Sequence, residues 1–224
     1  MPGIWVSKDS NLNEDRLKVW ETLFQRALKL IDSVPAAGVQ LDYWTFGGGT
    51  VLMRRHHHRY SKDIDIFVSD PQWLGYLTPR LNDVAESMTT NYIEAAESLK
   101  LVFKEGEIDF VAAGPLTEKP WVMEQLFGRE VRVETSAEIV GKKAWYRGQL
   151  FTARDIFDLA MIAELEPAAL FPIQPILRDR KDAILGRIRS DDASLREAFG
   201  ALDILDYRRT YDECVALAKE ALEG

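Results

Sequence analysis

FGGGTVLMRRHHHRYSKDIDIFVSD, residues 46–70, holds most of the unusual chemistry of this chain. It opens with three glycines and a threonine, continues with a basic run that contains every histidine, and ends with Asp63 and Asp65 inside an apolar segment. Because side chains alternate between the two faces of a strand, both aspartates are expected on one face and their isoleucine neighbours on the other. The stretch therefore predicts a strand over 63–69 with two neighbouring carboxylates and a buried apolar face.

The paired carboxylates require a compensating charge, because neighbouring anions repel each other and their burial is costly. Mg²⁺ meets this requirement, since it takes oxygen ligands and commonly binds one or two carboxylates together with substrate phosphates. Asp109, in the segment GEIDFVA, is expected on a second strand as a candidate third carboxylate. The alternative is an edge strand whose aspartates are solvated and paired with Lys62 or Arg59.

The glycine turn follows an expected short strand over 41–46. Glycine N–H groups can approach an anion closely, Thr50 adds a hydroxyl donor, and a helix expected over 50–59 adds its N-terminal dipole. The turn has neither the P-loop nor the dinucleotide-binding spacing. Since Asp63 follows thirteen residues after Thr50, the stretch predicts a nucleoside triphosphate site that includes Gly48 and Gly49. The alternative is a tight turn that requires glycine for a positive φ.

The basic run between turn and aspartates carries four arginine and lysine charges and no acid over residues 54–62. Three interpretations stay open. The run is a solvated loop, or His56–His58 bind a transition metal, or the cations meet a triphosphate or an RNA backbone. The last interpretation makes Arg59 and Lys62 candidate nucleotide-binding residues.

Composition limits the function classes. The chain has 224 residues and a formal net charge of −8, which excludes a general nucleic-acid binder. The single cysteine, Cys214, excludes an internal disulfide and a cysteine-rich zinc site, and it fits a reducing cytoplasm. No apolar run approaches the roughly 20 residues that cross a bilayer, and no secretory signal is recognised at the N-terminus. We therefore expect a cytoplasmic protein without a membrane segment.

The remaining patterns change character near residue 135. Before it, we expect helices over 14–34, capped by Asn13, and over 78–97, a hairpin over 98–104 and 107–112, and a strand over 130–134. After it, apolar spacing predicts helices over 136–146, 153–165, 173–189, 191–199 and 208–222. The fold class is therefore α+β: a mixed sheet with flanking helices in a domain over 1–135, followed by a helical domain over 136–224.

Two segments resemble known motifs. Gly48-Gly49-Thr50, followed by Ser61-Lys62-Asp63-Ile64-Asp65-Ile66-Phe67, resembles the G-G-[ST]…D-x-D signature of nucleotidyltransferases of the polymerase-β type, and more narrowly that of the AbiEii/AbiGii toxin family. The later segment, Lys142-Lys143, Tyr146-Arg147 and Arg154-Asp155-Ile156-Phe157-Asp158-Leu159, resembles that family's K…R…R-D-x-x-D-L segment. The resemblance covers roughly residues 40–165.

The resemblance implies a nucleotidyltransferase-like sheet and a Mg²⁺-dependent transfer of a nucleoside monophosphate from a nucleoside triphosphate to an acceptor hydroxyl. The acceptor would be the 3′ end of tRNA or a protein, and the protein would be a toxin with a separate antitoxin. Asp63 and Asp65 would hold Mg²⁺, and Asp109 would be a third metal ligand or the base.

The resemblance also assigns roles to the triphosphate-binding and late residues. The turn Gly48–Thr50 and Lys143 would bind the triphosphate, and Asp155, with Asp158, would complete the catalytic set. Local structure offers an alternative, because Thr152 and Asp155 fit a capping box and Arg154 and Asp158 fit an i, i+4 surface pair. Lys142 is a second candidate for the role of Lys143.

Two other functions share these motifs. One is a nucleotidyltransferase for a small molecule of the aminoglycoside type, which the acidic net charge permits. The other is a nucleotide-binding module without turnover, against which the intact Thr50, Asp63 and Asp65 argue.

Overall fold

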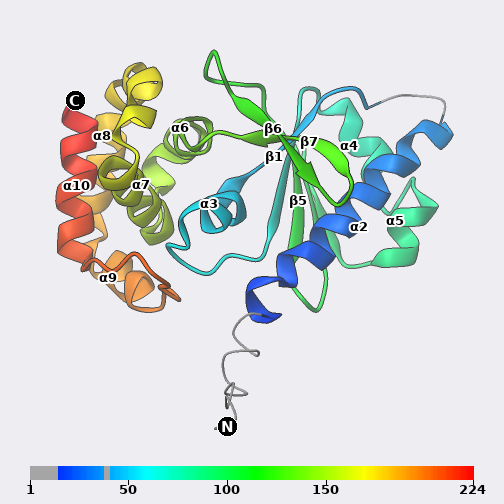
Figure 1. Cartoon of the computed structure of the whole chain (residues 1–224), viewed down its shortest axis with the longest axis horizontal. Helices are drawn as coiled ribbons and strands as arrows, with labels where there is room; N and C mark the ends of the chain where they lie inside the picture. Colours follow the sequence, from blue (N-terminus) through cyan, green and yellow to red (C-terminus); the bar gives the residue numbers. More distant parts are fainter. Residues whose placement is uncertain (1–14, 38–40) are drawn as a thin grey trace, which may run out of the picture. The chain divides into compact units, whose positions relative to one another are not determined.

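The computed structural model describes residues 15–37 and 41–224, so the expected cap at Asn13 lies outside the described residues (Figure 1). Contacts within the chain divide it into two compact units. Unit 1 consists of Met1–Trp44 and Ser61–Ala113, and unit 2 of Thr45–Tyr60 and Gly114–Gly224. The expected domains, 1–135 and 136–224, stay a prediction.

The long helix of unit 1 lies within the range expected from its apolar spacing. Helix α2, Val19–Ser33, turns one face inward and continues into the 3-10 turn η1, Val34–Ala37. The helix contacts β2 and β5, and Figure 1 shows it crossing β5. Its buried residues are Trp20, Leu23, Phe24, Ala27, Leu28, Leu30 and Ile31. The i, i+3, i+4 spacing of this face explains why the segment is helical.

The strands of unit 1 lie in the order β3-β4-β5-β2. Strand β2, Ile64–Val68, runs parallel to β5, Glu107–Ala112, and β4, Ser98–Val102, is antiparallel to β5. In all three strands buried residues alternate with partly exposed ones. The expected strand over 63–69 and the hairpin are therefore confirmed, and one face of this sheet is apolar and the other polar.

The helix expected over 78–97 is wrong. The segment instead follows α4, Gln72–Leu77, and contains α5, Asp83–Met88, and β3, Tyr92–Glu94. Pro79 disfavours a helical conformation of the residue before it, and Thr78 is extended, with ψ of 140°. Asn82 then starts α5 by accepting hydrogen bonds from two backbone N–H groups.

Unit 2 contains the strands β1, β7 and β6 in that order. Strand β1, Trp44–Gly47, is parallel to β7, Arg129–Glu134, which forms a hairpin with β6, Trp121–Leu126. Phe127 and Gly128 have φ of 51° and 79°, as a two-residue hairpin turn requires. The strand expected over 130–134 is confirmed, whereas β6 was not predicted.

The helices of unit 2 confirm the helical character of the chain's second half. Helix α7 packs against α10, and α6 packs against α8 (Figure 1). The elements are α3, Gly48–His56; α6, Ser136–Arg147; η2, Gly148–Leu150; α7, Ala153–Leu165; η3, Pro167–Ile173; α8, Gln174–Ser190; α9, Asp192–Gly200; and α10, Tyr211–Glu223. Together with the mixed strands, they confirm the α+β class.

Candidate active site

The polar face of unit 1 brings predicted carboxylates together. Asp65 on β2 lies directly beside Asp109 on β5, because the two strands are parallel and these residues are register partners. Asp63 immediately precedes β2 and shares the face of Asp65 by alternation. The neighbouring Ile64 and Ile66 are fully buried on the other face. The strand alternation predicted from the sequence therefore produces an acidic face, with Asp63 and Asp65 partly exposed.

The carboxylate of Asp63 is hydrogen-bonded to the backbone at the start of β5. Its Oδ1 accepts a hydrogen bond from the backbone N–H of Glu107 at 3.0 Å. A Cβ at Gly106 would lie 2.9 Å from the same oxygen and 3.0 Å from Leu23 Cδ1. The turn residue is therefore a glycine because the carboxylate of Asp63 occupies the space that a side chain would need.

Asp109 has a cationic neighbour that the sequence analysis did not single out. Lys100 on β4 is its register partner, and Lys100 Nζ lies 3.2 Å from Asp109 Oδ2. Lys100 also donates to the Glu107 carboxylate. Burial raises the pKa of Asp109, an effect that Lys100 opposes and that Glu107 and Asp63 reinforce. The signal for Lys100 was available, since the Glu105-Gly106 turn fixes the hairpin register.

The acidic face can serve a divalent cation in part. Among residues 15–37 and 41–224, no group of three or more histidine, cysteine or acidic side chains is arranged to hold a metal ion. Mg²⁺, however, is commonly held by one or two carboxylates and completed by substrate phosphates and water. Asp63 and Asp65 fit such a two-carboxylate site, whereas Asp109 shares its carboxylate with a lysine.

The glycine turn joins β1 to helix α3 in unit 2. Gly47 is the extended N-cap of α3, with no capping side chain, and Gly48 has φ of 74°, which favours glycine. Thr50, in the first turn of α3, is fully buried. The strand–turn–helix arrangement matches the sequence prediction, and its helix begins at Gly48 rather than at 50. Backbone N–H groups at such a helix start favour an anion.

Glu134, a buried acid, is the last residue of β7, and β7 pairs in parallel with β1, the strand that leads into this turn. Glu134 Oε1 accepts hydrogen bonds from Thr45 Oγ1 at 2.8 Å and from Lys142 Nζ at 2.6 Å. The Glu134 carbonyl accepts a bond from Arg55 Nη1 at 2.6 Å. Burial raises the pKa of Glu134 to about 7, although Lys142 and Thr45 oppose the shift. Glu134 therefore links β1, α3 and α6.

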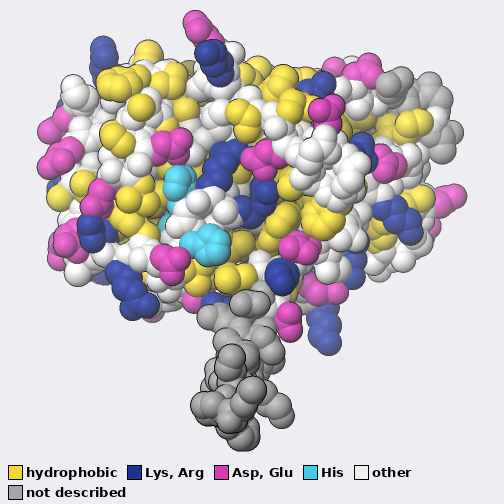
Figure 2. Space-filling view, viewed as in Figure 1, with side chains coloured by type: hydrophobic (Ala, Val, Ile, Leu, Met, Phe, Trp, Pro, Cys, Tyr) yellow, Lys and Arg dark blue, Asp and Glu magenta, His cyan; other side chains and the backbone are white. Residues whose placement is uncertain are grey.

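The three histidines point to three different partners. His56 lies 3.4 Å from Glu166, His57 is exposed and lies 4.0 Å from Asp206, and buried His58 lies 2.9 Å from Asp158. Figure 2 shows histidine side chains at the surface with acidic side chains beside them. His57 ends α3 in the left-handed region, with φ of 49°. The run therefore presents no shared transition-metal site.

The late motif forms a buried ionic cluster. Lys143 Nζ lies 2.8 Å from Asp155 and 3.0 Å from Asp158, and Arg147 Nη1 lies 2.8 Å from Asp155. Asp158 also accepts from Arg59, and both aspartates are fully buried. Burial acts to raise the pKa of each aspartate, but Lys143 with Arg147 lowers that of Asp155 to about 2, and Arg59 with Lys143 holds that of Asp158 well below its usual value.

Of the two local interactions considered for the late motif, one is present and the other is absent. The capping box is present, since Thr152 and Asp155 satisfy each other's backbone N–H groups at the start of α7. The surface pair of Arg154 and Asp158 is wrong, because Arg154 is exposed and Asp158 is fully buried against His58, Arg59 and Lys143. Burial, not helix spacing, selects these partners.

The cluster bears on three predicted site residues. Arg59 is buried and binds both carboxylate oxygens of Asp158, Lys143 is shared by two carboxylates, and Asp155 accepts four side-chain or backbone groups. Contact of these side chains with a substrate would require the cluster to open. Lys62 lies outside it, partly exposed beside Asp63 in unit 1. Nucleotide binding by Arg59, Lys62 and Lys143, and catalysis by Asp155, stay predictions.

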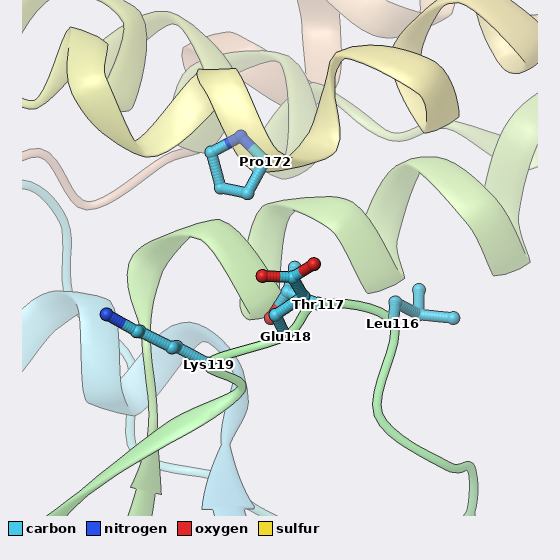
Figure 3. A pocket seen from close by; sticks show the side chains of 5 residues that line it. All are labelled: Leu116, Thr117, Glu118, Lys119 and Pro172. Atoms are coloured by element: carbon cyan, nitrogen blue, oxygen red, sulfur yellow. The ribbon is translucent and has the colours of Figure 1, made fainter.

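A separate pocket of about 410 Å³ lies between the loop before β6 and helix η3 of unit 2. Figure 3 shows its lining, in which Pro172 lies across from the loop. Glu138 supports the loop by accepting the backbone N–H groups of Leu116 and Thr117. The lining residues are Leu116, Thr117, Glu118, Lys119 and Pro172, and none of them is a predicted site residue.

Comparison with known proteins assigns the chain to a family. Residues 36–221 match the family model described as nucleotidyl transferase AbiEii toxin, type IV TA system. The chain belongs to the AbiEii family of nucleotidyltransferase toxins. The match also includes most of residues 167–224, which the sequence motifs left unplaced. The chain is therefore a nucleotidyltransferase.

One solved toxin structure shares the fold. The MenT4 nucleotidyltransferase toxin of Mycobacterium tuberculosis H37Rv is 16% identical with a TM-score of 0.50, over 92% of this chain and 82% of that chain. A structure from H. pylori assigned as a nucleotidyltransferase is 18% identical with a TM-score of 0.44, over 97% and 96%. Among the curated proteins, none matches this sequence. In the described part of the chain, no helix combines the length and apolarity that a membrane span requires.

Proposed function

We propose that this AbiEii-family chain transfers a nucleoside monophosphate from a nucleoside triphosphate to an acceptor hydroxyl, on the 3′ end of tRNA or on a protein, and that it requires Mg²⁺. The observation that carries the proposal is the register of Asp65 beside Asp109, with Asp63 on the same face and anchored by a backbone N–H. This arrangement supports the proposal, because a metal–triphosphate complex is commonly held by one or two carboxylates.

The reaction forms one bond and breaks one. The acceptor oxygen attacks the α-phosphorus, the bond from the α-phosphorus to the bridging oxygen breaks, and pyrophosphate leaves with that electron pair. Bound Mg²⁺ would neutralise charge on the triphosphate. Asp63 and Asp65 would hold it, and the raised pKa of Asp109 suits a group that takes the acceptor's proton.

The glycine turn of unit 2 supports a separate proposal, which concerns phosphate binding. The N-cap Gly47 carries no side chain, so the first N–H groups of α3 can donate hydrogen bonds to phosphate oxygens, and Gly48 adopts the positive φ that this turn needs. We propose that Gly48, Gly49 and Thr50 bind the β and γ phosphates. Lys62 precedes the metal ligands directly and adds a partly exposed cation.

In this proposal the buried cluster contributes to function by stabilising unit 2. The charges of Lys143 and Arg59 are already neutralised by Asp155 and Asp158. Lys143 and Arg59 are therefore needed for the folding of unit 2, in addition to any contact that they make with a nucleotide. As a toxin-family member, the chain is expected to act with a cognate antitoxin.

The test is transfer of label. Purified protein is incubated with Mg²⁺, each α-labelled nucleoside triphosphate in turn, and total RNA, a protein extract or an aminoglycoside. We expect the wild type to label RNA or protein and Asp65→Asn to lose at least about 100-fold in rate. Asp83→Asn, on exposed residue Asp83 of α5, is the matched control and keeps the rate.

The result distinguishes the functions. Label on an aminoglycoside alone would replace the proposed acceptor, and nucleotide binding without label on any acceptor would contradict the proposed transfer. Expression of the wild type, but not of Asp65→Asn, should arrest growth of a host cell if the transfer is toxic.

A further inference from the structure

One cation lies in the acidic row of unit 1. Strand register places Asp65, Asp109 and Lys100 side by side on β2, β5 and β4. The alternation of burial shows that all three face the same side, since the residues on either side of them in each strand are more buried. The row of side chains that begins with Asp65 and Asp109 therefore continues with a cation, Lys100.

The lysine is bound to the third carboxylate. Lys100 Nζ lies 3.2 Å from Asp109 Oδ2 and also contacts the Glu107 carboxylate. Only about a third of the Lys100 side chain is exposed, at 32%. Two carboxylates, those of Glu107 and Asp109, lie against this ammonium and favour its charged form. Asp109 thus has a permanent positive neighbour on the side away from Asp65.

A permanent ammonium changes what Asp109 can bind. Two cations within a few ångströms of one carboxylate repel each other, and the repulsion is strong where water is partly excluded. A divalent ion coordinated by Asp109 would have to displace Lys100 or tolerate its charge. Lys100 forms its ion pairs with Asp109 and Glu107, on the side of Asp109 away from Asp65.

We propose that Lys100 is a positioning residue that fixes Asp109 and supplies a positive charge in place of a second metal ion. The site then takes one divalent cation, on Asp63 and Asp65, and Asp109 is not a metal ligand. The inference rests on the proposed function for the presence of the metal ion. Of the two roles considered for Asp109, metal ligand and base, only the role of base then remains.

The test is a Mn²⁺ titration of the full chain followed by electron paramagnetic resonance, without nucleotide. The wild type should bind one Mn²⁺. Asp65→Asn should weaken binding by about tenfold or more, and Asp109→Asn by less than about threefold. Lys100→Met frees Asp109 and should tighten binding by at least about threefold or add a second ion.

Two variants separate charge from folding. Lys100→Arg keeps the positive charge and should reproduce the wild-type titration. Lys104→Met removes an exposed lysine next to the same hairpin turn and should also change nothing. Wild-type binding of two ions, equal weakening by Asp109→Asn and Asp65→Asn, or a Lys100→Met titration identical to wild type would each overturn the inference.

The failures are distinguishable. If the wild type labels an acceptor but Asp109→Asn loses Mn²⁺ binding, the inference fails and the proposed function stands. If the Mn²⁺ pattern is as expected but nothing is labelled, the proposed transfer fails and the role of Lys100 stands. Absence of Mn²⁺ binding by the wild type would overturn the inference as well as the metal requirement.

Discussion

Arg59 holds Asp158 with two hydrogen bonds, from Nε to Oδ1 at 2.7 Å and from Nη2 to Oδ2 at 2.8 Å. The two residues belong to motifs that lie 99 residues apart in the sequence. Their pairing fixes the end of the basic run against α7 inside unit 2. The basic run is therefore partly a structural element, in which one arginine neutralises a fully buried acid.

Removal of this arginine should destabilise the fold. Arg59→Met leaves Asp158 with Lys143 and His58 alone, and breaking a buried ion pair costs about 3–5 kcal/mol. Urea unfolding at pH 7 measures the change. Arg154→Met, at an exposed arginine of the same motif, is the control and should stay within about 0.5 kcal/mol of wild type. Equal stabilities of the two variants would refute this role for Arg59.

Asp155 should make the fold sensitive to acid. Burial acts to raise the pKa of Asp155, but Lys143, Arg147 and Thr152 outweigh it and lower this pKa to about 2 from its ordinary value of 3.8. A lowered folded-state pKa gives stability that is complete above the unfolded-state value and is lost as pH falls toward 2. The wild type should therefore exceed Asp155→Asn by about 2 kcal/mol at pH 6, and by much less near pH 2.

The measurement is urea unfolding of both proteins at several pH values from 2 to 7. A difference between wild type and Asp155→Asn that does not shrink on acidification would show that the carboxylate charge is not what stabilises the cluster. Asp83→Asn again controls for the loss of a carboxylate at an exposed position.

Local patterns predicted those parts of the structure that depend on nearby residues. The alternation in β2 and β5 and the capping box of Thr152 with Asp155 all follow from spacings of four residues or fewer. The helix expected over 78–97 failed because Pro79 and the cap at Asn82 outweigh the helical composition.

The partners of the charged residues could not be predicted in the same way. Arg59 and Asp158 are brought together by the packing of α7, and Glu134 meets Thr45 across 89 residues. Such pairs are selected by burial, because a charge enclosed in the core must be neutralised wherever its partner lies in the sequence. Lys100 was the exception, since the hairpin turn alone places it opposite Asp109.

Gly106 should be essential for the position of Asp63. In Gly106→Ala the new Cβ would lie 2.9 Å from Asp63 Oδ1 and 3.0 Å from Leu23 Cδ1, so the carboxylate or the turn must shift. We expect the transfer rate to fall by about tenfold or more, because catalysis depends on precise placement. Urea unfolding should show a loss of about 1–3 kcal/mol.

Gly75 offers a matched control for this change. It lies in α4, and a Cβ there would meet no atom within 4 Å. Gly75→Ala should therefore keep the transfer rate and leave stability unchanged or slightly higher. Full activity of Gly106→Ala would show that the proposed site does not depend on the position of the Asp63 carboxylate.

Glu134 should produce the opposite pH dependence to Asp155. Burial raises its pKa to about 7 from 4.5, despite Lys142 and Thr45. A raised pKa in the folded state means that the protonated acid is favoured there, so stability falls as pH rises from about 4.5 through 7. Glu134→Gln removes this ionisation and keeps an oxygen that accepts from Lys142. Relative to Glu134→Gln, the wild type should lose about 2–3 kcal/mol of stability between pH 4.5 and 8.

Urea unfolding at both pH values measures the change, with Glu130→Gln on the exposed part of β7 as control. Parallel stability curves for wild type and Glu134→Gln would show that Glu134 stays ionised throughout and that its contact with Lys142 outweighs its burial.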